Sequence, residues 1–219
     1  MRKPDGTARR GQVLYNFGPG AIVDFRTSDG ATISVINSSI DRWEEEFLEN
    51  NKIRRSLIIR EARLEKKLLV NNFITPPINS EDHQEGDASN SQGNLVGIRF
   101  PKNLQCPVCN EIKRYDKWEQ NKIEDPARFC AKCSSQDKKS YVIPSRFLIA
   151  CTDGHLDEFP WDTFFYKIKH KKKDCKKKYG LEQKSTIGLS GLRLKCIDCE
   201  SYYSFENIFT KEISKELAC

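Results

Sequence analysis

The sequence predicts an α+β protein in which a small mixed N-terminal domain is joined by a linker to a cysteine-rich half. Three observations support this organisation. Residues 1–77 alternate short strand-like apolar runs with helix-like stretches. Residues 78–94 contain a single apolar side chain larger than Ala, which predicts a flexible linker. Of the nine cysteines, eight lie between residues 106 and 199, and the ninth is Cys219.

Composition narrows the class of protein further. An apolar fraction of 37% is low for a compact globule, so we expect something besides burial to hold part of the fold. The odd number of cysteines and the polar start, MRKPDGTARR, argue against a secreted disulfide scaffold. No apolar run approaches the roughly 18 residues of a membrane span. We therefore expect a reduced, cytoplasmic protein without membrane contact, whose thiols bind metal.

The N-terminal region contains several recognisable elements. Residues 11–25, GQVLYNFGPGAIVDF, predict an extended segment, a turn at Gly18–Gly20 and a strand. Residues 32–36, TISVI, predict another strand. Residues 56–70, SLIIREARLEKKLLV, predict a strand that leads into a helix, which the prolines beyond it end.

Two Cys-x-x-Cys motifs, CPVC (106–109) and CAKC (130–133), are separated by twenty residues. Two residues between thiolates let each turn aim both sulfurs at one tetrahedral ion, and two such turns complete a four-thiolate zinc site. A redox Cys-x-x-Cys is the alternative. We predict a zinc ribbon over residues 95–143, with a closed and therefore structural zinc. Its ligands are Cys106, Cys109, Cys130 and Cys133.

A third motif, CIDC (196–199), needs two further ligands for a second ion. The sequence offers Cys175 twenty residues before it and Cys219 nineteen residues after it. The predicted second set is Cys175, Cys196, Cys199 and Cys219, within a second zinc-binding module over residues 144–219. Cys151 or His155 in place of Cys175 or Cys219 is an alternative, and so is the absence of a second ion. The cysteine-rich half is thus predicted to consist of zinc-ribbon modules with zinc as cofactor.

Residues 151–162, CTDGHLDEFPWD, bring together a thiol, an imidazole and four carboxylates. They lie between a predicted strand and an amphipathic helix at about residues 160–168, whose apolar face recurs at helical spacing. Asp157 and Glu158 would lie near the positive end of that helix. A Cys151–His155 nucleophile pair would also need an orienting group and an oxyanion site, and neither is identifiable. We predict a structural corner, no catalytic residues and no enzymatic activity.

The motifs GQVLYNFGPGAIVDF, REARLEKKLLVNNFITPP, IRFPKNLQCPVC, SRFLIACTDGHLDEFPW and GLSGLRLKCIDC occur in this order. Together they resemble the DrmB proteins of the DISARM anti-phage defence system, over residues 11–219 apart from the linker and a lysine-rich insertion. The resemblance implies a non-helicase subunit that pairs with a helicase and binds DNA with it. It also implies that the chain corresponds to the N-terminal part of a longer family, or to a short or split member.

Residues 167–178, KIKHKKKDCKKK, contain eight lysines. On the residues alone, a solvated loop is the leading interpretation. The resemblance shifts the preference to contact with DNA phosphates. The lysines predicted to bind nucleic acid are Lys171, Lys172, Lys173, Lys176, Lys177 and Lys178.

The function predicted from the sequence is that of a zinc-stabilised, non-catalytic subunit of a DNA-acting anti-phage defence complex. Its expected partners are a helicase subunit and DNA. A free-standing zinc-ribbon nucleic-acid-binding protein, acting in transcription or repair, is the first alternative. The second is a hydrolase built on residues 151–162.

Overall fold

The structure is a computed structural model that describes residues 10–75 and 97–217. Within these ranges it leaves out residues 28, 38–47, 50–51, 54, 124, 171–174, 177, 185–187, 211–212, 214 and 216. The linker predicted at residues 78–94 and the predicted ligand Cys219 therefore lie outside the described residues. The chain divides into two compact units, one of residues 1–24 and 35–99, the other of residues 25–34 and 100–219.

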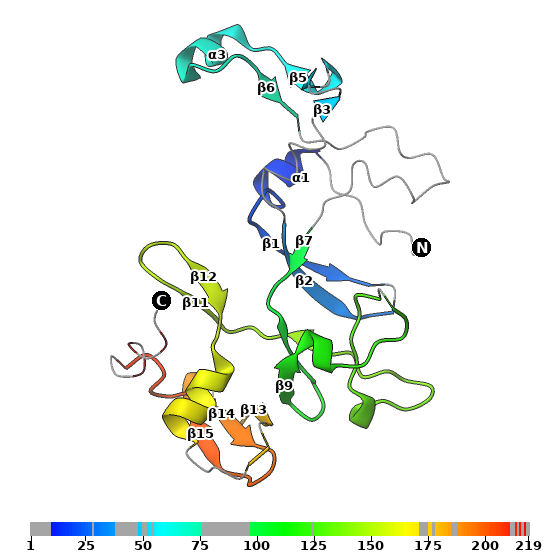
Figure 1. Ribbon diagram of the computed structural model, residues 1–219, viewed down its shortest axis with the longest axis vertical. Helices are drawn as coiled ribbons and strands as arrows, with labels where there is room; N and C mark the ends of the chain where they lie inside the picture. Colours follow the sequence, from blue (N-terminus) through cyan, green and yellow to red (C-terminus); the bar gives the residue numbers. More distant parts are fainter. Residues whose placement is uncertain are drawn as a thin grey trace. The chain divides into compact units, whose positions relative to one another are not determined.

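Short strands dominate the described residues (Figure 1). They are β1 (Ile22–Arg26), β2 (Thr32–Asn37), β3 (Leu48–Glu49), β4 (Lys52–Ile53), β5 (Ile58–Ile59), β6 (Phe73–Ile74), β7 (Gly97–Arg99), β8 (Asn103–Gln105), β9 (Glu111–Arg114), β10 (Ile143–Pro144), β11 (Leu148–Ala150), β12 (Leu156–Glu158), β13 (Tyr179–Gln183), β14 (Leu192–Cys196) and β15 (Tyr202–Ser204). The α-helices are α1 (Arg10–Tyr15) and α3 (Ala62–Leu68), and Thr163–Lys169 form a π-helix. Short 3-10 helices are formed by Arg55–Leu57, Tyr115–Lys117, Ala131–Cys133 and Leu189–Gly191. A mixed protein with few helices and several antiparallel sheets agrees with the predicted α+β class. No helix among the described residues is both long enough and apolar enough to cross a bilayer.

Residues 10–75 contain several of the elements predicted from the sequence. Strand β2 covers the predicted 32–36 run, and β5 is followed by α3, as the 56–70 pattern indicated. The extended segment predicted at the start of residues 11–25 is wrong, because α1 forms there. The carbonyl of Gln12 accepts the N–H groups of Asn16 and Phe17, and the side chain of Val13 is completely buried. This helical turn therefore buries one apolar side chain where the sequence pattern predicted an extended chain.

The second unit is built around a six-stranded antiparallel sheet in the order β10-β8-β9-β13-β14-β15. Strand β13 joins its two halves, because Tyr179 lies opposite Ile112 of β9 and also opposite Cys196 of β14. One sheet therefore contains strands from both ranges, 95–143 and 144–219, that the sequence assigned to separate modules. The turns that carry Cys106 with Cys109 and Cys196 with Cys199 both connect strands of this sheet.

An aromatic core packs beside this sheet in the second unit. Trp161, Phe164 and Phe165 are each at most 2% exposed, and the ring of Phe164 lies 5.3 Å from that of Phe205. These three side chains belong to the apolar face predicted for the helix at about residues 160–168. The backbone N–H of His170 donates to the carbonyl of Phe165, five residues earlier, so the last turn is of the wide π type.

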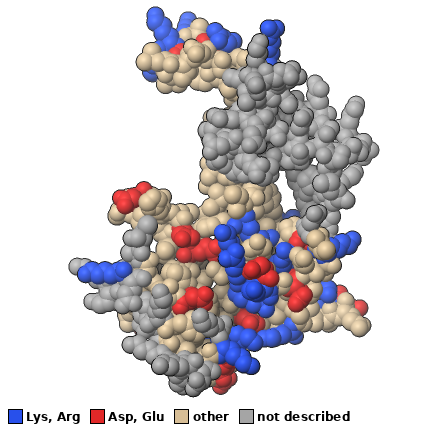
Figure 2. Space-filling model, viewed as in Figure 1, with Lys and Arg blue, Asp and Glu red and all other residues tan. Residues whose placement is uncertain are grey.

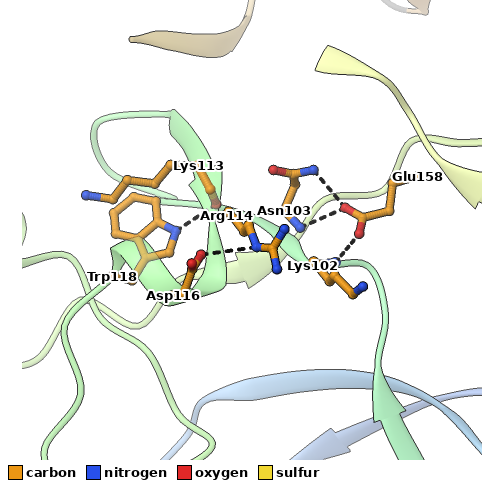
Figure 3. Close-up of polar contacts among 7 residues, drawn as sticks. All are labelled: Lys102, Asn103, Lys113, Arg114, Asp116, Trp118 and Glu158. Atoms are coloured by element: carbon orange, nitrogen blue, oxygen red, sulfur yellow. Dashed lines mark hydrogen bonds and ion pairs between the residues drawn. The ribbon is translucent and has the colours of Figure 1, made fainter. Parts of the chain in front are cut away.

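The segment between residues 148 and 158 differs from the predicted strand–turn–helix corner. Strands β11 and β12 form a hairpin, so a second strand separates the turn from the helix. Glu158 does not cap the helix; its carboxylate accepts the backbone N–H groups of Lys102 and Asn103 and the side-chain amide of Asn103 (Figure 3). The predicted role of Glu158 at the helix end is therefore wrong.

Candidate metal centres

The first candidate centre consists of the four cysteines of the two Cys-x-x-Cys motifs. The ligand atoms of Cys106, Cys109, Cys130 and Cys133 all lie within 4.8 Å of one another. The sulfurs of Cys109 and Cys130 are 3.9 Å apart. A tetrahedral ion with metal–sulfur bonds of about 2.3 Å would separate two sulfurs by about 3.8 Å. The group can therefore hold a tetrahedral metal ion with little rearrangement.

The turn that carries Cys106 and Cys109 connects β8 to β9. The backbone N–H of Cys106 donates to the carbonyl of Glu111 at 3.0 Å, and that of Asn110 donates to the carbonyl of Cys106 at 2.9 Å. Asn110 has a left-handed conformation, with φ of 60°. A further backbone donor, the N–H of Val108, lies 3.4 Å from the Cys106 sulfur. This turn aims both thiols to one side and supplies a hydrogen bond to one of them.

The turn that carries Cys196 and Cys199 repeats this geometry between β14 and β15. The N–H of Cys196 donates to Ser201 at 2.9 Å and that of Glu200 donates to Cys196 at 3.0 Å, while Glu200 has φ of 58°. In both turns a buried leucine, Leu104 or Leu194, stands two residues before the first cysteine. We call these two turns the first knuckle (residues 106–110) and the second knuckle (residues 196–200). They are two copies of one local structure.

Strand β13 and the residue before it, Lys178, are hydrogen-bonded to the two knuckles. The N–H of Leu181 donates to the carbonyl of Asn110 at 3.1 Å, and the N–H of Ile197 donates to the carbonyl of Lys178 at 3.1 Å. Gly180 lies between these two bonds, and a Cβ atom there would be 2.8 Å from the Asn110 oxygen. Close approach of the first knuckle to β13 therefore requires glycine at position 180.

The second candidate centre contains a ligand that sequence reasoning missed. His170, Cys175, Cys196 and Cys199 have ligand atoms within 4.8 Å of one another, and His170 Nε2 is 3.9 Å from the Cys199 sulfur. Three of the four predicted ligands are thus brought together. Cys219, the fourth, lies outside the described residues, and His170 supplies the fourth donor among those described.

The surroundings of His170 fix the orientation of its ring. The side chain is 2% exposed, and its ring is stacked on Phe165 with centroids 4.9 Å apart. Its Nδ1 lies 2.9 Å from the hydroxyl oxygen of Tyr203. When Nδ1 donates its proton to Tyr203, the lone pair of Nε2 faces the cysteines. Such an outer hydrogen bond is typical of metal-binding histidines.

The thiols of both centres have unequal acidities. Burial raises the pKa of Cys109 to about 12, and loss of hydration together with the neighbouring sulfurs raises the pKa of Cys175 to about 12. Hydrogen bonds from the Ser201 side chain and backbone lower the pKa of Cys199 to about 7. The pKa of Cys106 is also lowered: burial opposes this, but hydrogen bonds from the backbone of Cys109 and Val108 outweigh it. Cys106 and Cys199 therefore ionise more readily than Cys109 and Cys175, and a bound cation would offset the repulsion between thiolates.

The remaining predicted residues lie outside these two centres. Cys151 and His155 do not join the second centre; with Asp153 they form a separate, largely exposed group at the tip of the β11–β12 hairpin. Lys176 and Lys178 are exposed, whereas Lys171, Lys172, Lys173 and Lys177 lie outside the described residues. Figure 2 shows Lys and Arg side chains interspersed with Asp and Glu over the unit that carries the cysteines.

Fold and candidate centres together define a mixed protein whose antiparallel sheet carries two thiol-rich groups suited to metal. The chain belongs to the family described as a domain of unknown function, DUF8724, whose profile matches residues 9–219. It is also 30% identical over 112 residues to the DISARM protein DrmB of Bacillus paralicheniformis. The matched region covers 51% of this chain and 19% of that relative, so the chain spans only a small part of its length. The resemblance to DrmB proteins that the ordered motifs indicated is therefore confirmed.

Proposed function

We propose that this protein is a zinc-stabilised, non-catalytic subunit of a DNA-acting anti-phage defence complex, in which it pairs with a helicase subunit and contacts DNA. The observation that carries the defence role is the 30% identity to the DISARM protein DrmB. The matched region covers 51% of this chain and 19% of that relative. The helicase partner and the binding to DNA are therefore proposed here and follow from the family resemblance. The cysteine centres and the lysine-rich segment supply its physical basis.

Zinc is the metal that the two donor sets favour. Four thiolates, or three thiolates with one imidazole, are typical ligand sets of structural zinc, and soft sulfur ligands disfavour Mg²⁺ and Ca²⁺. Cys106, Cys109, Cys130 and Cys133 would hold one ion, and His170, Cys175, Cys196 and Cys199 a second. Both sets are complete with four protein ligands, so neither leaves a coordination position for substrate. Zinc at these positions would hold the knuckles, as in zinc-ribbon modules, and would not perform chemistry.

Contact with DNA is assigned to the lysine-rich segment. Lys176 and Lys178 are exposed and directly precede β13, and four more lysines lie within seven residues before Lys178. Ammonium groups bind the phosphate backbone by neutralising its charge, which supplies affinity without sequence preference. The segment would therefore strengthen binding of the assembled complex to any DNA sequence.

Pull-down of the tagged full-length chain from its native cells, followed by mass spectrometry and elemental analysis, tests the proposal. We expect a helicase in stoichiometric amount and at least about two zinc ions per chain. A matched pull-down with Cys109→Ser measures how far partner binding depends on the first centre. Less than one zinc per chain would contradict the metal assignment. DNA binding by the purified chain, with no helicase recovered, would contradict the complex and favour a free-standing zinc-ribbon protein of transcription or repair.

A further inference from the structure

A third set of metal-ligand side chains lies on one hairpin of the second unit. Cys151, Asp153 and His155 occupy alternate positions of the loop that connects β11 to β12, and their ligand atoms lie within 4.8 Å of one another. Cys151 is half-buried, whereas Asp153 and His155 are exposed. The three types of donor, thiolate, carboxylate and imidazole, are the three that bind zinc in proteins.

The backbone of the loop holds these donors on one side. Strand pairing ends with Ala150 opposite Leu156, and the N–H of Cys151 then donates to the carbonyl of His155 at 3.1 Å. The N–H of Gly154 donates to the carbonyl of Cys151 at 3.1 Å, and Gly154 has φ of 83°. This left-handed residue returns the chain so that His155 faces Cys151 again. The loop is therefore already ordered, and binding of an ion would cost little further conformational entropy.

The distance between the sulfur and the imidazole matches that of two ligands on one ion. The Cys151 sulfur lies 3.5 Å from His155 Nδ1. Zinc bonds of about 2.3 Å to sulfur and about 2.0–2.1 Å to nitrogen, at a tetrahedral angle, place those two atoms about 3.5 Å apart. The carboxylate of Asp153 is close enough to supply a third ligand.

We propose that this hairpin tip is a third metal site, at which Cys151, Asp153 and His155 bind a divalent transition-metal ion such as zinc. Three protein ligands leave a position open, in contrast to the two four-ligand centres. Water occupies that position, and an anionic oxygen ligand such as phosphate can replace the water. The site is separate from the centres of the proposed function and uses none of their residues.

Cobalt(II) titration of the full-length, metal-free chain tests this site, with cobalt as a spectroscopic probe for zinc. We expect three equivalents of cobalt to bind the native chain, and the loss of one equivalent in His155→Asn and in Asp153→Asn. Asp157→Asn, a carboxylate change on the neighbouring strand of the same hairpin, should leave all three equivalents. Circular dichroism of each variant checks that the fold is retained, and the two independent ligand changes guard against a variant that fails to fold.

The same experiment separates this site from the two centres. Cys109→Ser and Cys196→Ser should each remove a different equivalent while the hairpin equivalent remains. Inorganic phosphate should shift the d–d absorption of cobalt only while the hairpin ligands are intact. An unchanged number of equivalents in His155→Asn and Asp153→Asn would overturn the third site and leave the four-ligand centres standing. Loss of an equivalent in Asp157→Asn as well would also overturn it, since any surface carboxylate would then serve.

Discussion

The carboxylate of Glu158 binds Asn103 through two hydrogen bonds, with its Oε2 2.8 Å from the backbone nitrogen and 2.8 Å from Nδ2. Its other oxygen accepts the N–H of Lys102 at 2.7 Å. Asn103 is the first residue of β8, the strand that leads into the first knuckle. The β11–β12 hairpin therefore supports the strand that directly precedes Cys106, although the two are far apart in the sequence.

Glu158→Gln should lower the free energy of unfolding by about 1–3 kcal/mol, because the new NH₂ group would face the donors of Asn103. Asp157→Asn changes the adjoining carboxylate, which accepts the N–H of Glu158 within its own strand. It should cost about 0.5 kcal/mol or less, as surface changes usually do. Urea unfolding curves measure both. Equal losses in the two variants would show that the Asn103 contacts contribute nothing.

Tyr203→Phe should weaken metal binding at the second centre by about 10–100-fold, because it removes the oxygen that orients His170. The ring that packs against Phe165 is retained. Tyr202→Phe removes a hydroxyl from the adjacent, 45% exposed tyrosine and serves as the matched control. Competition with a chromophoric chelator gives the affinities. Identical zinc affinity in the two variants would contradict the role of the Tyr203 hydroxyl.

Cys109→Ser should remove zinc from the first centre and unfold its surroundings, since structural zinc supplies roughly 10–16 kcal/mol of binding free energy in small zinc-finger peptides. Val108→Ala alters the same knuckle at a side chain that is 65% exposed, and keeps all four thiols. Zinc content and resistance to limited proteolysis report the two effects. Retention of a full complement of zinc by Cys109→Ser would exclude this cysteine as a ligand.

Replacing Lys176 and Lys178 by Gln should weaken DNA binding by the assembled complex equally for all sequences. Each lysine that no longer neutralises a phosphate should make the slope of log affinity against log salt less steep by about 0.9, hence about 1.8 for two. Lys66→Gln with Lys67→Gln removes the same charge from exposed positions on α3. Salt-dependent binding isotherms distinguish the two pairs. An unchanged slope in the Lys176 and Lys178 variant would identify the segment as a solvated loop.

Gly180→Ala should destabilise the second unit by about 1–3 kcal/mol, the usual cost of forcing extra volume into a packed site. The new methyl group would lie 2.8 Å from the carbonyl oxygen of Asn110. Because this oxygen belongs to the backbone, it cannot move away by a change of side-chain rotamer. Gly11→Ala, where nothing lies within 4 Å of a Cβ, should cost little. Thermal unfolding compares the two. A normal melting temperature for Gly180→Ala would mean that the first knuckle shifts freely.

Local sequence signals predicted part of the fold and of the candidate centres. The cysteines of the first centre could be predicted because each Cys-x-x-Cys motif builds its own turn, so the spacing alone brings the sulfurs together. Strand β2 and helix α3 follow from runs of suitable period. The burial of Trp161, Phe164 and Phe165 follows from their helical spacing in the same way.

Contacts between distant segments could not be predicted in this way. His170 stands five residues before Cys175 among lysines, a spacing that no metal-binding turn explains. Its role depends on the π-type helix end, on Phe165 and on Tyr203, which lies 33 residues further on. Glu158 resembled a helix-end carboxylate because its partner at Asn103 is 55 residues away. The only signal for His170 was a lone histidine in a lysine run.

The two hydrogen bonds that join β13 to the knuckles also determine its register. Lys178 accepts the N–H of Ile197 in the second knuckle, and Leu181 donates to Asn110 in the first. A slip of β13 by one residue would exchange the two faces of the strand. It would turn Tyr179 and Leu181, now at most 7% exposed, toward solvent and bury the ammonium group of Lys178. The two knuckles therefore stabilise the observed register of β13 and also disfavour the pairing that is shifted by one residue.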